Sequence, residues 1–454
     1  MFKRNKFFDV DMLAGPIYSN LIAFSLPLMA SSMLQLLYNA ADIIVVGRFT
    51  GPDALAAVGS CASLINLIIN LFLGLSVGAN VVIARDVGAG DYKSAREAVH
   101  SSVVLAVLGG TIIGIFGYIF GGTFLNWMGS PETVLPLATQ YIKIYFIGMP
   151  FNMLYNFGAA VLRSVGDTRH PLYFLTLAGV VNVALNLILV IVFDMGVAGV
   201  ALATIASQAL SAVLVLICLF RSEGVIHLEL KRMRISMRKL SEMMRIGLPA
   251  GIQSCCFSIS NVLIQSTVNS FGAIVVAANS ASCSIENFVY AAMNSVHQAA
   301  VTFVSANVGA GNNRRMRECM RKALVLVFII GCSICALFML LRTPLLKVYT
   351  TEDAVVEAGY GRLTLILWTY WIFGIMDVLC GAIRGLGASI TPLIVSLMGI
   401  CVFRIFWIYA ILPFDKTYLM LMVSYPISWV LTVFAHYVCV RKRLKRFPVE
   451  NEKQ

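Results

Sequence analysis

The stretch Val87-Gly88-Ala89-Gly90 occurs again as Val308-Gly309-Ala310-Gly311, 221 residues further along the chain. Other blocks return at the same offset: Gly51 as Gly272, Arg96-Glu97 as Arg317-Glu318, Arg163 as Arg384, and Pro171-Leu172 as Pro392-Leu393. Separate blocks that keep one offset indicate a duplicated unit. In a membrane protein, such a repeat is typical of a transporter whose site lies between or within the halves.

The composition is that of a membrane protein. The chain is 59% hydrophobic and 12% charged, with a mean hydropathy of +0.85, whereas soluble domains carry about 25% charged residues. A helix needs about 20 mostly apolar residues to cross the hydrocarbon. We predict twelve such spans, six in each repeat, near residues 17–44, 54–83, 98–120, 134–160, 171–193, 197–220, 240–268, 274–304, 320–341, 358–383, 391–412 and 417–440.

These spans predict an all-α polytopic membrane protein built from two six-helix bundles. An even number of spans returns the chain to its starting side, so a pseudo-two-fold axis along the membrane normal should relate the bundles. The predicted domains are a first bundle (1–220), a cytoplasmic amphipathic linker (221–239), a second bundle (240–441) and a cytoplasmic tail (442–454).

The net charge of +12 is unevenly distributed. Lys and Arg concentrate in alternate connections, above all in residues 221–245, 314–322 and 441–446. This positive-inside pattern puts both termini in the cytoplasm, and it favours the lipid bilayer over nucleic acid as the partner of the charge. The expected location is the inner membrane of a bacterium, where the protein would act as a monomer.

The sequence offers little for cofactor or enzyme chemistry. Its eleven cysteines fall in spans or on the predicted cytoplasmic side, so we expect reduced thiols. Cys332 and Cys335 form a Cys-x-x-Cys pair without a second pair, which argues against a metal site. No metal triad, serine–histidine pair or paired carboxylates stand at catalytic spacing. We therefore expect no catalytic residue, metal or cofactor, and a secondary carrier driven by an ion gradient.

One acid in the first span stands out. An ionisable group at membrane depth costs about 2.5–3.5 kcal/mol, so each is a functional candidate. Asp42 ends a stripe of Gln35, Tyr38 and Asn39 on one helical face. Such a face should line a cavity, where loss of hydration favours proton exchange by the carboxyl near neutral pH.

Polar side chains on other spans of the first bundle can complete this cavity. We predict an ion-coupling set of Asp42, Asn156, Asn182, Asn186 and Thr204. The predicted substrate contacts there are Gln35, Tyr38, Asn39, Asn66, Asn70, Tyr141 and Asn152.

The second bundle carries different chemistry. Its seventh span has no acid, and the predicted substrate contacts are Asn261, Gln265, Glu286, Tyr290 and Asp377. Arg404 lies about 20 Å deep at 1.5 Å per residue, so we expect it to pair with Glu286 or Asp377. Substrate contact and a structural ion pair both remain open for these two acids.

Prolines mark the expected moving parts. Pro27 and Pro249 occupy matched places in the first and seventh spans. A proline inside a helix removes a backbone hydrogen bond and permits a bend. We predict that these two residues act as hinges.

The motifs carry a family resemblance over nearly the whole chain. Residues 162–171 read Leu-Arg-Ser-Val-Gly-Asp-Thr-Arg-His-Pro, and their partners 383–392 read Ile-Arg-Gly-Leu-Gly-Ala-Ser-Ile-Thr-Pro. With the two Val-Gly-Ala-Gly turns, these loops resemble the multidrug and toxic compound extrusion (MATE) transporters. The resemblance implies antiport of organic, often cationic, drugs against H⁺ or Na⁺, and it implies that Asp42 binds the coupling ion.

The chain departs from the family pattern at two places. Many bacterial members have an Asn-x-x-x-Asp pattern on the fifth span, where this chain has Asn182 and Asn186. Others have an acid on the seventh span, where this chain has Asn261 and Gln265. These losses concentrate ion coupling on Asp42 and make Glu286 the best acid to attract a cationic substrate.

Two other classes of carrier fit the sequence less well. A flippase or exporter of lipid-linked or other amphiphilic metabolites would need cations for phosphate, and the spans offer mainly Lys143 and Arg404. A major-facilitator carrier should have Gly-x-x-x-Asp-Arg-x-Gly-Arg-Arg after the second span, where this chain reads Ala-Arg-Asp-Val-Gly-Ala-Gly-Asp at 84–91.

Overall fold

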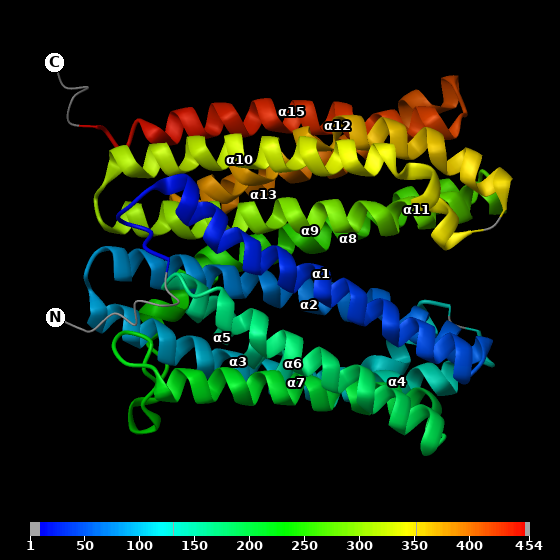
Figure 1. Cartoon of the computed structure of the whole chain (residues 1–454), viewed down its shortest axis with the longest axis horizontal. Helices are drawn as coiled ribbons and strands as arrows, with labels where there is room; N and C mark the ends of the chain where they lie inside the picture. The colour runs from blue at the N-terminus through cyan, green and yellow to red at the C-terminus, as the bar shows by residue number, and fades with distance from the viewer. Residues whose placement is uncertain (1–9, 130, 351, 450–454) are drawn as a thin grey trace. The chain divides into compact units, whose positions relative to one another are not determined.

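The computed structural model describes residues 10–129, 131–350 and 352–449, and every regular element in them is a helix (Figure 1). This confirms the all-α prediction. The first half contains α1 (Ile17–Phe49), α2 (Pro52–Gly88), α3 (Tyr92–Trp127), α4 (Leu135–Ile147), α5 (Met149–Ser164), α6 (Arg169–Leu187) and α7 (Gly196–Arg221). The second contains α8 (Met237–Asn269), α9 (Ala273–Gly309), α10 (Asn313–Leu340), α11 (Arg342–Tyr349), α12 (Asp353–Gly385), α13 (Ile390–Ser396), α14 (Phe403–Phe406) and α15 (Tyr418–Leu444).

Ten helical segments in the described ranges are long and apolar enough to cross a membrane. Two predicted spans are not among them. The span near 134–160 is interrupted at Gly148, between α4 and α5. The other, α9, has 37 residues but many serines and asparagines, which lower its hydropathy. Polar spans of this kind bury their polar face against neighbouring helices.

The described chain packs as two compact units whose limits fall inside helices. One unit holds Ala30–Leu248, and the other holds Asp11–Met29 with the residues from Pro249 onward. The first part of α1 and the first part of α8 are therefore exchanged relative to the repeats. The predicted domains, 1–220 and 240–441, follow the sequence repeat and do not anticipate this exchange.

Close contacts explain the exchange in each unit. In α1, Phe24 meets Phe303 of α9 edge to face, with ring centroids 5.5 Å apart. In α8, a Cβ on Gly247 would lie 2.7 Å from Leu75 Cα of α2, so only glycine permits this approach. Pro27 lies inside α1 and Pro249 inside α8, each close to the point where its helix passes from one unit to the other. Their role as hinges remains a prediction.

The duplicated Val-Gly-Ala-Gly motif forms the turns before α3 and α10. Gly90 and Gly311 adopt left-handed φ values of 73° and 68°, a conformation that favours glycine. Asp91 then caps α3 by accepting from Ser94 N, and its repeat partner Asn312 caps α10 by accepting from Arg315 N.

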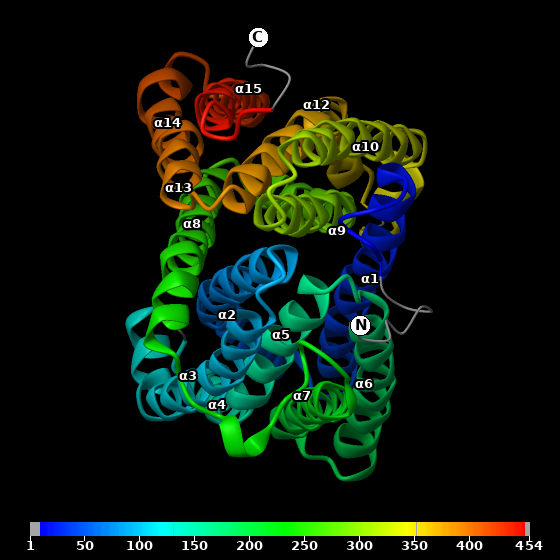
Figure 2. The same ribbon diagram turned by 90° about the vertical axis from the view of Figure 1, so that its left-hand side faces the viewer.

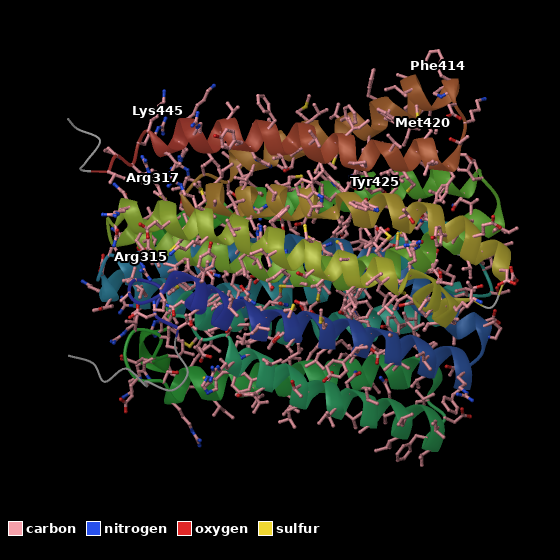
Figure 3. The ribbon with its side chains drawn as sticks, turned by 45° about the horizontal axis from the view of Figure 1, so that its top comes forward. Arg315, Arg317, Phe414, Met420, Tyr425 and Lys445 are labelled. Carbon is pink, nitrogen blue, oxygen red and sulfur yellow. The ribbon has the colours of Figure 1, made fainter. Side chains whose placement is uncertain are left out.

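The duplicated arginines fasten the segment that follows each bundle. Arg96 reaches Glu229 Oε1 (3.3 Å) and the Gly224 carbonyl (3.1 Å) beyond α7. Its partner Arg317 donates to the carbonyls of Leu444 (3.3 Å) and Phe447 (3.2 Å) at the end of α15. Figure 3 shows Arg317 at the same end of the helices as Lys445. The repeated sequence blocks therefore have a structural function in both units.

The linker predicted at 221–239 is mostly irregular. It contains one 3₁₀ turn, Leu230–Arg232, and α8 begins at Met237. Leu228 is buried, whereas Leu230 and Met237 are 71% and 73% exposed. The segment is amphipathic in composition without forming a continuous amphipathic helix.

Candidate functional site

Polar side chains from α1, α5, α6 and α7 converge on one cavity of about 100 Å³ in the first unit. Eight predicted site residues line it: Gln35, Tyr38, Asn39, Asp42, Asn152, Asn156, Asn182 and Thr204. Ser207 and Gln208 of α7 line it as well. The helical spacing on α1 thus places its polar stripe on a cavity, as the sequence indicates.

Asp42 is partly buried at this cavity and is held by an amide. Its Oδ1 accepts a hydrogen bond from Asn186 Nδ2, and the same amide nitrogen lies 3.3 Å from Asn182 Oδ1. Among the described residues, no lysine, arginine or histidine lies within ion-pair distance of the Asp42 carboxylate. The charge of Asp42 is therefore stabilised by dipoles alone, which a cation or a proton can supplement without breaking an ion pair.

Two buried acceptor atoms at the cavity lack a donor in the described part of the chain. The buried oxygens Asn186 Oδ1 and Gln208 Oε1 accept no hydrogen bond from the described residues. Thr204 Oγ1 donates to the Val200 carbonyl (2.9 Å), and Asn156 Nδ2 donates to Asn152 Oδ1 (3.0 Å). Buried polar atoms without partners are costly, so this cluster is suited to bind a hydrogen-bond donor or a hard cation.

The shape of the cavity depends on the glycine at position 179 of α6. Tyr38 of α1 lies against α6 so closely that a Cβ on Gly179 would come within 1.9 Å of its ring. The Tyr38 hydroxyl donates to the Thr176 carbonyl at 3.3 Å. Gly179 therefore sets how deeply the Tyr38 ring can enter the cavity wall.

Four predicted residues of the first bundle are not in the wall of this cavity: Asn186, which is bonded to Asp42, and Asn66, Asn70 and Tyr141. Asn66 is exposed on α2, and Asn70 lies one turn further along the same helix. Tyr141 is buried and stacks on Tyr145, with ring centroids 6.1 Å apart. It lies one layer behind the cavity, because Gln208 of the lining donates to Tyr145 Oη (3.5 Å).

In the second unit, Glu286 is engaged in a buried ion pair. Its two carboxylate oxygens accept from Arg362 Nε (3.0 Å) and Nη2 (2.9 Å). Arg362 also donates to Asn279 Oδ1 and lies 3.1 Å from Cys283 Sγ. Sequence reasoning missed Arg362, although a charged residue inside the predicted span 358–383 is a signal that could have been used.

The prediction that Arg404 pairs with Glu286 or Asp377 is wrong. Its Nε donates to Ser428 Oγ (3.2 Å), and its guanidinium lies over the Tyr425 ring, 3.9 Å from the centroid. Neither Glu286 nor Asp377 is its partner. A cation–π contact and a hydroxyl acceptor stabilise this buried charge instead.

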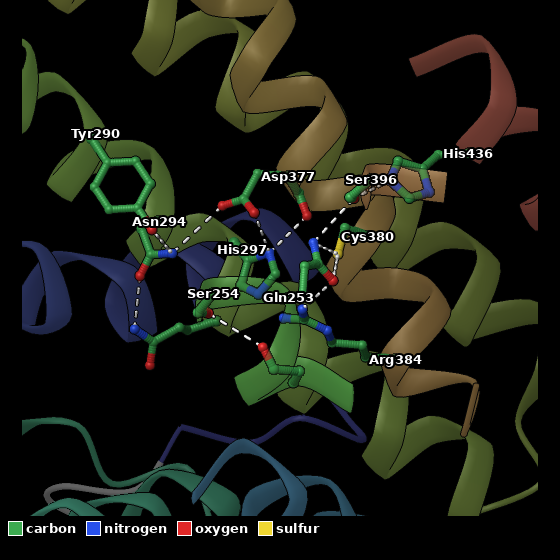
Figure 4. A network of polar contacts seen from close by, with 12 residues as sticks. Gln253, Ser254, Tyr290, Asn294, His297, Asp377, Cys380, Arg384, Ser396 and His436 are labelled. Carbon is green, nitrogen blue, oxygen red and sulfur yellow. Dashed lines mark hydrogen bonds and ion pairs between the residues drawn. The ribbon is translucent and has the colours of Figure 1, made fainter. Parts of the chain in front are cut away.

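Asp377 belongs to a polar network that includes Gln253, Arg384, Ser396 and His436 (Figure 4). His297 Nδ1 lies 3.1 Å from Asp377 Oδ1, and Asn294 Nδ2 lies 3.5 Å from Oδ2. The same asparagine approaches Tyr290 Oη at 3.3 Å, which brings two predicted contacts, Tyr290 and Asp377, together.

The remaining predicted contacts lie on α8. Gln265 Oε1 accepts from Asn279 Nδ2 (2.8 Å), so it adjoins the Glu286–Arg362 cluster. Asn261 is exposed on α8. No group of three or more His, Cys, Asp or Glu residues among the described residues could hold a metal ion.

Known proteins match this chain along almost its whole length. The MatE family model matches residues 27–188 and again 249–410. The "Probable multidrug resistance protein YoeA" of Bacillus subtilis is 26% identical over 438 residues, covering 94% of this chain and 95% of the relative. An "FAD transporter" of Shewanella oneidensis is 25% identical over 395 residues, covering 85% and 86%.

A solved structure described as the outward-facing conformation of a multidrug resistance MATE family transporter superposes with a TM-score of 0.91. It covers 97% of this chain and 98% of the solved chain at 23% identity, and supports the fold. The duplicated helical fold with its apolar spans defines a multi-pass membrane transporter. The chain belongs to the MatE family, because the family model covers most of both repeats.

Proposed function

We propose that this protein is a secondary antiporter that exports organic, often cationic, compounds in exchange for H⁺ or Na⁺. Family membership and relatives named for multidrug resistance support the transport class. The observation that carries the coupling proposal is the Asp42 carboxylate, which borders a polar cavity and is bonded to the neutral Asn186 amide.

The ion would act by neutralising Asp42. A proton or Na⁺ entering from outside removes the net charge of the carboxylate and changes its bond to Asn186. An ion can shift a conformational equilibrium only by its differential affinity for the two states. One proton supplies about 1.4 kcal/mol per pH unit and about 2.3 kcal/mol per 100 mV, which suffices for uphill export.

The helix that carries Asp42 also carries Pro27. We propose that neutralisation of Asp42 bends α1 at this proline and lowers the affinity for the exported compound, and that Pro249 in α8 allows the corresponding motion. The ion-coupling set then comprises Asp42, Asn156, Asn182, Asn186 and Thr204. Gln35, Tyr38, Asn39 and Asn152 would contact the substrate.

The distribution of charge along the chain supports one orientation in the membrane. We propose that the protein lies in the cytoplasmic membrane of a bacterium as a monomer, with both termini inside. The excess of Lys and Arg in residues 221–245 and 441–446 supports this orientation.

Uptake by proteoliposomes with imposed gradients tests the proposal. A proton gradient and a Na⁺ gradient are imposed separately. The gradient that drives accumulation of a fluorescent organic cation identifies the coupling ion. Accumulation that depends on neither gradient would refute secondary antiport.

A second candidate is export of an anionic, amphiphilic metabolite, which one relative named as an FAD transporter favours. The described arginines at depth in the second unit argue against it, because Arg362 and Arg404 already have partners. Competition distinguishes the two candidates. Excess FAD should leave the uptake of a cationic dye unchanged if the substrate is cationic.

A further inference from the structure

A second cavity of the first unit lies where the linker, residues 221–239, crosses the start of α3. Its volume is about 660 Å³, and its wall includes Lys93, Arg96, His100, Arg234 and Ser236. Figure 2 shows the linker between α7 and α8 passing the end of α3. Hydrogen bonds fix this arrangement: Ser236 N donates to Ser101 Oγ (3.0 Å), and Arg238 Nη2 donates to Ser94 Oγ (3.0 Å).

The floor of this cavity is preorganised. His100 Nδ1 lies 2.8 Å from the Arg96 carbonyl, and Glu229 N donates to His100 Nε2 at 3.0 Å. The backbone N–H of Glu229 uses Nε2 as its acceptor, and Nδ1 faces the Arg96 carbonyl. Arg96 holds Glu229 and Gly224 in turn. These contacts tie the linker to α3 and leave the rim residues to meet a ligand.

The rim carries cations that the protein does not neutralise. Lys93 and Arg234 are exposed, and neither has an ion-pair partner among the described residues. The single acid of the wall is Glu97. Two free cations beside the hydroxyl of Ser236 form a donor set suited to phosphate oxygens.

We propose that this cavity binds a phosphate-bearing anionic group, supplied by the headgroup of a phospholipid. The length of α3 favours the lipid source. Its 36 residues extend about 54 Å, against a hydrocarbon thickness of about 30 Å, so its first turns reach headgroup level. Leu230 and Met237 flank the cationic segment and are strongly exposed, as expected of residues that enter the lipid interface.

Native mass spectrometry of the full-length protein with phosphatidylglycerol tests this site. The wild type should retain this lipid in preference to phosphatidylcholine. Lys93→Ala/Arg234→Ala should weaken retention by about thirtyfold, since each cation in contact with the headgroup phosphate contributes roughly fivefold to binding. Both side chains are exposed, so the fold should persist.

The other repeat provides a matched control. Arg314 is the repeat partner of Lys93, and both Arg314 and Arg321 are exposed on α10. Arg314→Ala/Arg321→Ala removes the same charge outside the cavity, so retention should fall much less than in Lys93→Ala/Arg234→Ala. Equal losses in the two double variants, or equal retention of both lipids by the wild type, would overturn the site. Displacement of phosphatidylglycerol by millimolar inorganic phosphate would overturn the lipid assignment and identify free phosphate as the ligand.

Discussion

Three carboxylates at membrane depth have three different environments. Asp42 is bonded to the Asn186 amide, Glu286 to the Arg362 guanidinium, and Asp377 lies beside His297. Loss of the charge of Glu286 would leave the buried Arg362 cation unpaired, whereas Asp42 has no cationic partner among the described residues to leave behind. The function of a carboxylate at membrane depth therefore depends on the side chain that it contacts.

The Glu286–Arg362 pair should be structural. Glu286→Gln leaves the buried Arg362 cation uncompensated, which should destabilise the protein by about 3–5 kcal/mol. Thermal unfolding in detergent should show a clearly lower Tm. Glu286→Leu/Arg362→Leu removes both charges and should recover much of the loss. An unchanged Tm in Glu286→Gln would show that the pair contributes nothing to stability.

The cap of α3 should respond to pH, whereas that of α10 should not. The hydrogen bond from Ser94 N holds the pKa of Asp91 below its ordinary value of 3.8. A lowered folded-state pKa contributes stability that is present above the unfolded value and is lost as the pH falls through the folded value. As the pH falls from the unfolded-state pKa of Asp91 through its folded-state pKa, the backbone amides in the first turn of α3 should therefore lose protection from hydrogen exchange.

The repeat supplies the control for this cap. Asn312 caps α10 without a charge, so the first turn of α10 should show no such change in hydrogen exchange. Asp91→Asn should retain the cap and abolish the pH response, and Asp91→Ala should lose the cap at every pH. Identical pH profiles for the two helices would contradict the assignment.

At the scale of elements, the cavity depends on how closely α1 approaches α6. Gly179→Ala would place a methyl group inside the present position of the Tyr38 ring. Overpacking of this kind costs about 1–3 kcal/mol, and relief requires the Tyr38 ring to move. We expect weaker substrate binding, measured by fluorescence titration with an organic cation, together with a lower Tm.

Gly59→Ala on α2 is the matched control. Nothing lies within 4 Å of a Cβ at Gly59, so the change should stabilise the helix by about 0.5–1 kcal/mol and leave binding unaltered. Equal binding in Gly179→Ala and Gly59→Ala would show that Tyr38 does not shape the site.

Helical periodicity predicts where the helices lie better than it predicts which side chains contact each other. The stripe on α1 reaches the cavity as expected, because one α-helix sets the whole pattern. Arg404 lies between two π-helical segments, Leu397–Val402 and Trp407–Ile411. These segments change the angle per residue, so the side of the helix that Arg404 presents could not be derived from α-helical spacing.

At the scale of the whole molecule, the repeat is visible in sequence, and the exchange of helix ends is not. The offset of 221 residues directly identifies the duplicated Val-Gly-Ala-Gly turns and the duplicated arginines Arg96 and Arg317. The transfer of Asp11–Met29 to the second unit depends on contacts such as Phe24 with Phe303. These contacts join residues far apart in the chain, for which one sequence carries no signal.

The two repeats share the same helical architecture, but their buried acids have different partners. The second unit pairs its buried acids with Arg362 and His297, whereas Asp42 in the first unit has an amide partner. From the sequence, the asparagine at position 186 led us to expect that ion coupling concentrates on Asp42. The sequence did not predict that Asn186 itself would hold Asp42.

The coupling role of Asp42 is tested most directly in proteoliposomes by comparing gradient-driven uptake with substrate counterflow. Asp42→Asn keeps an amide-sized side chain beside Asn186 and removes the charge. We predict that gradient-driven uptake falls at least about tenfold, which corresponds to about 1.4 kcal/mol of lost coupling, while counterflow persists. Asp53→Asn, an exposed change of equal charge on α2, should retain both activities. Gradient-driven uptake at the wild-type level in Asp42→Asn would contradict the account.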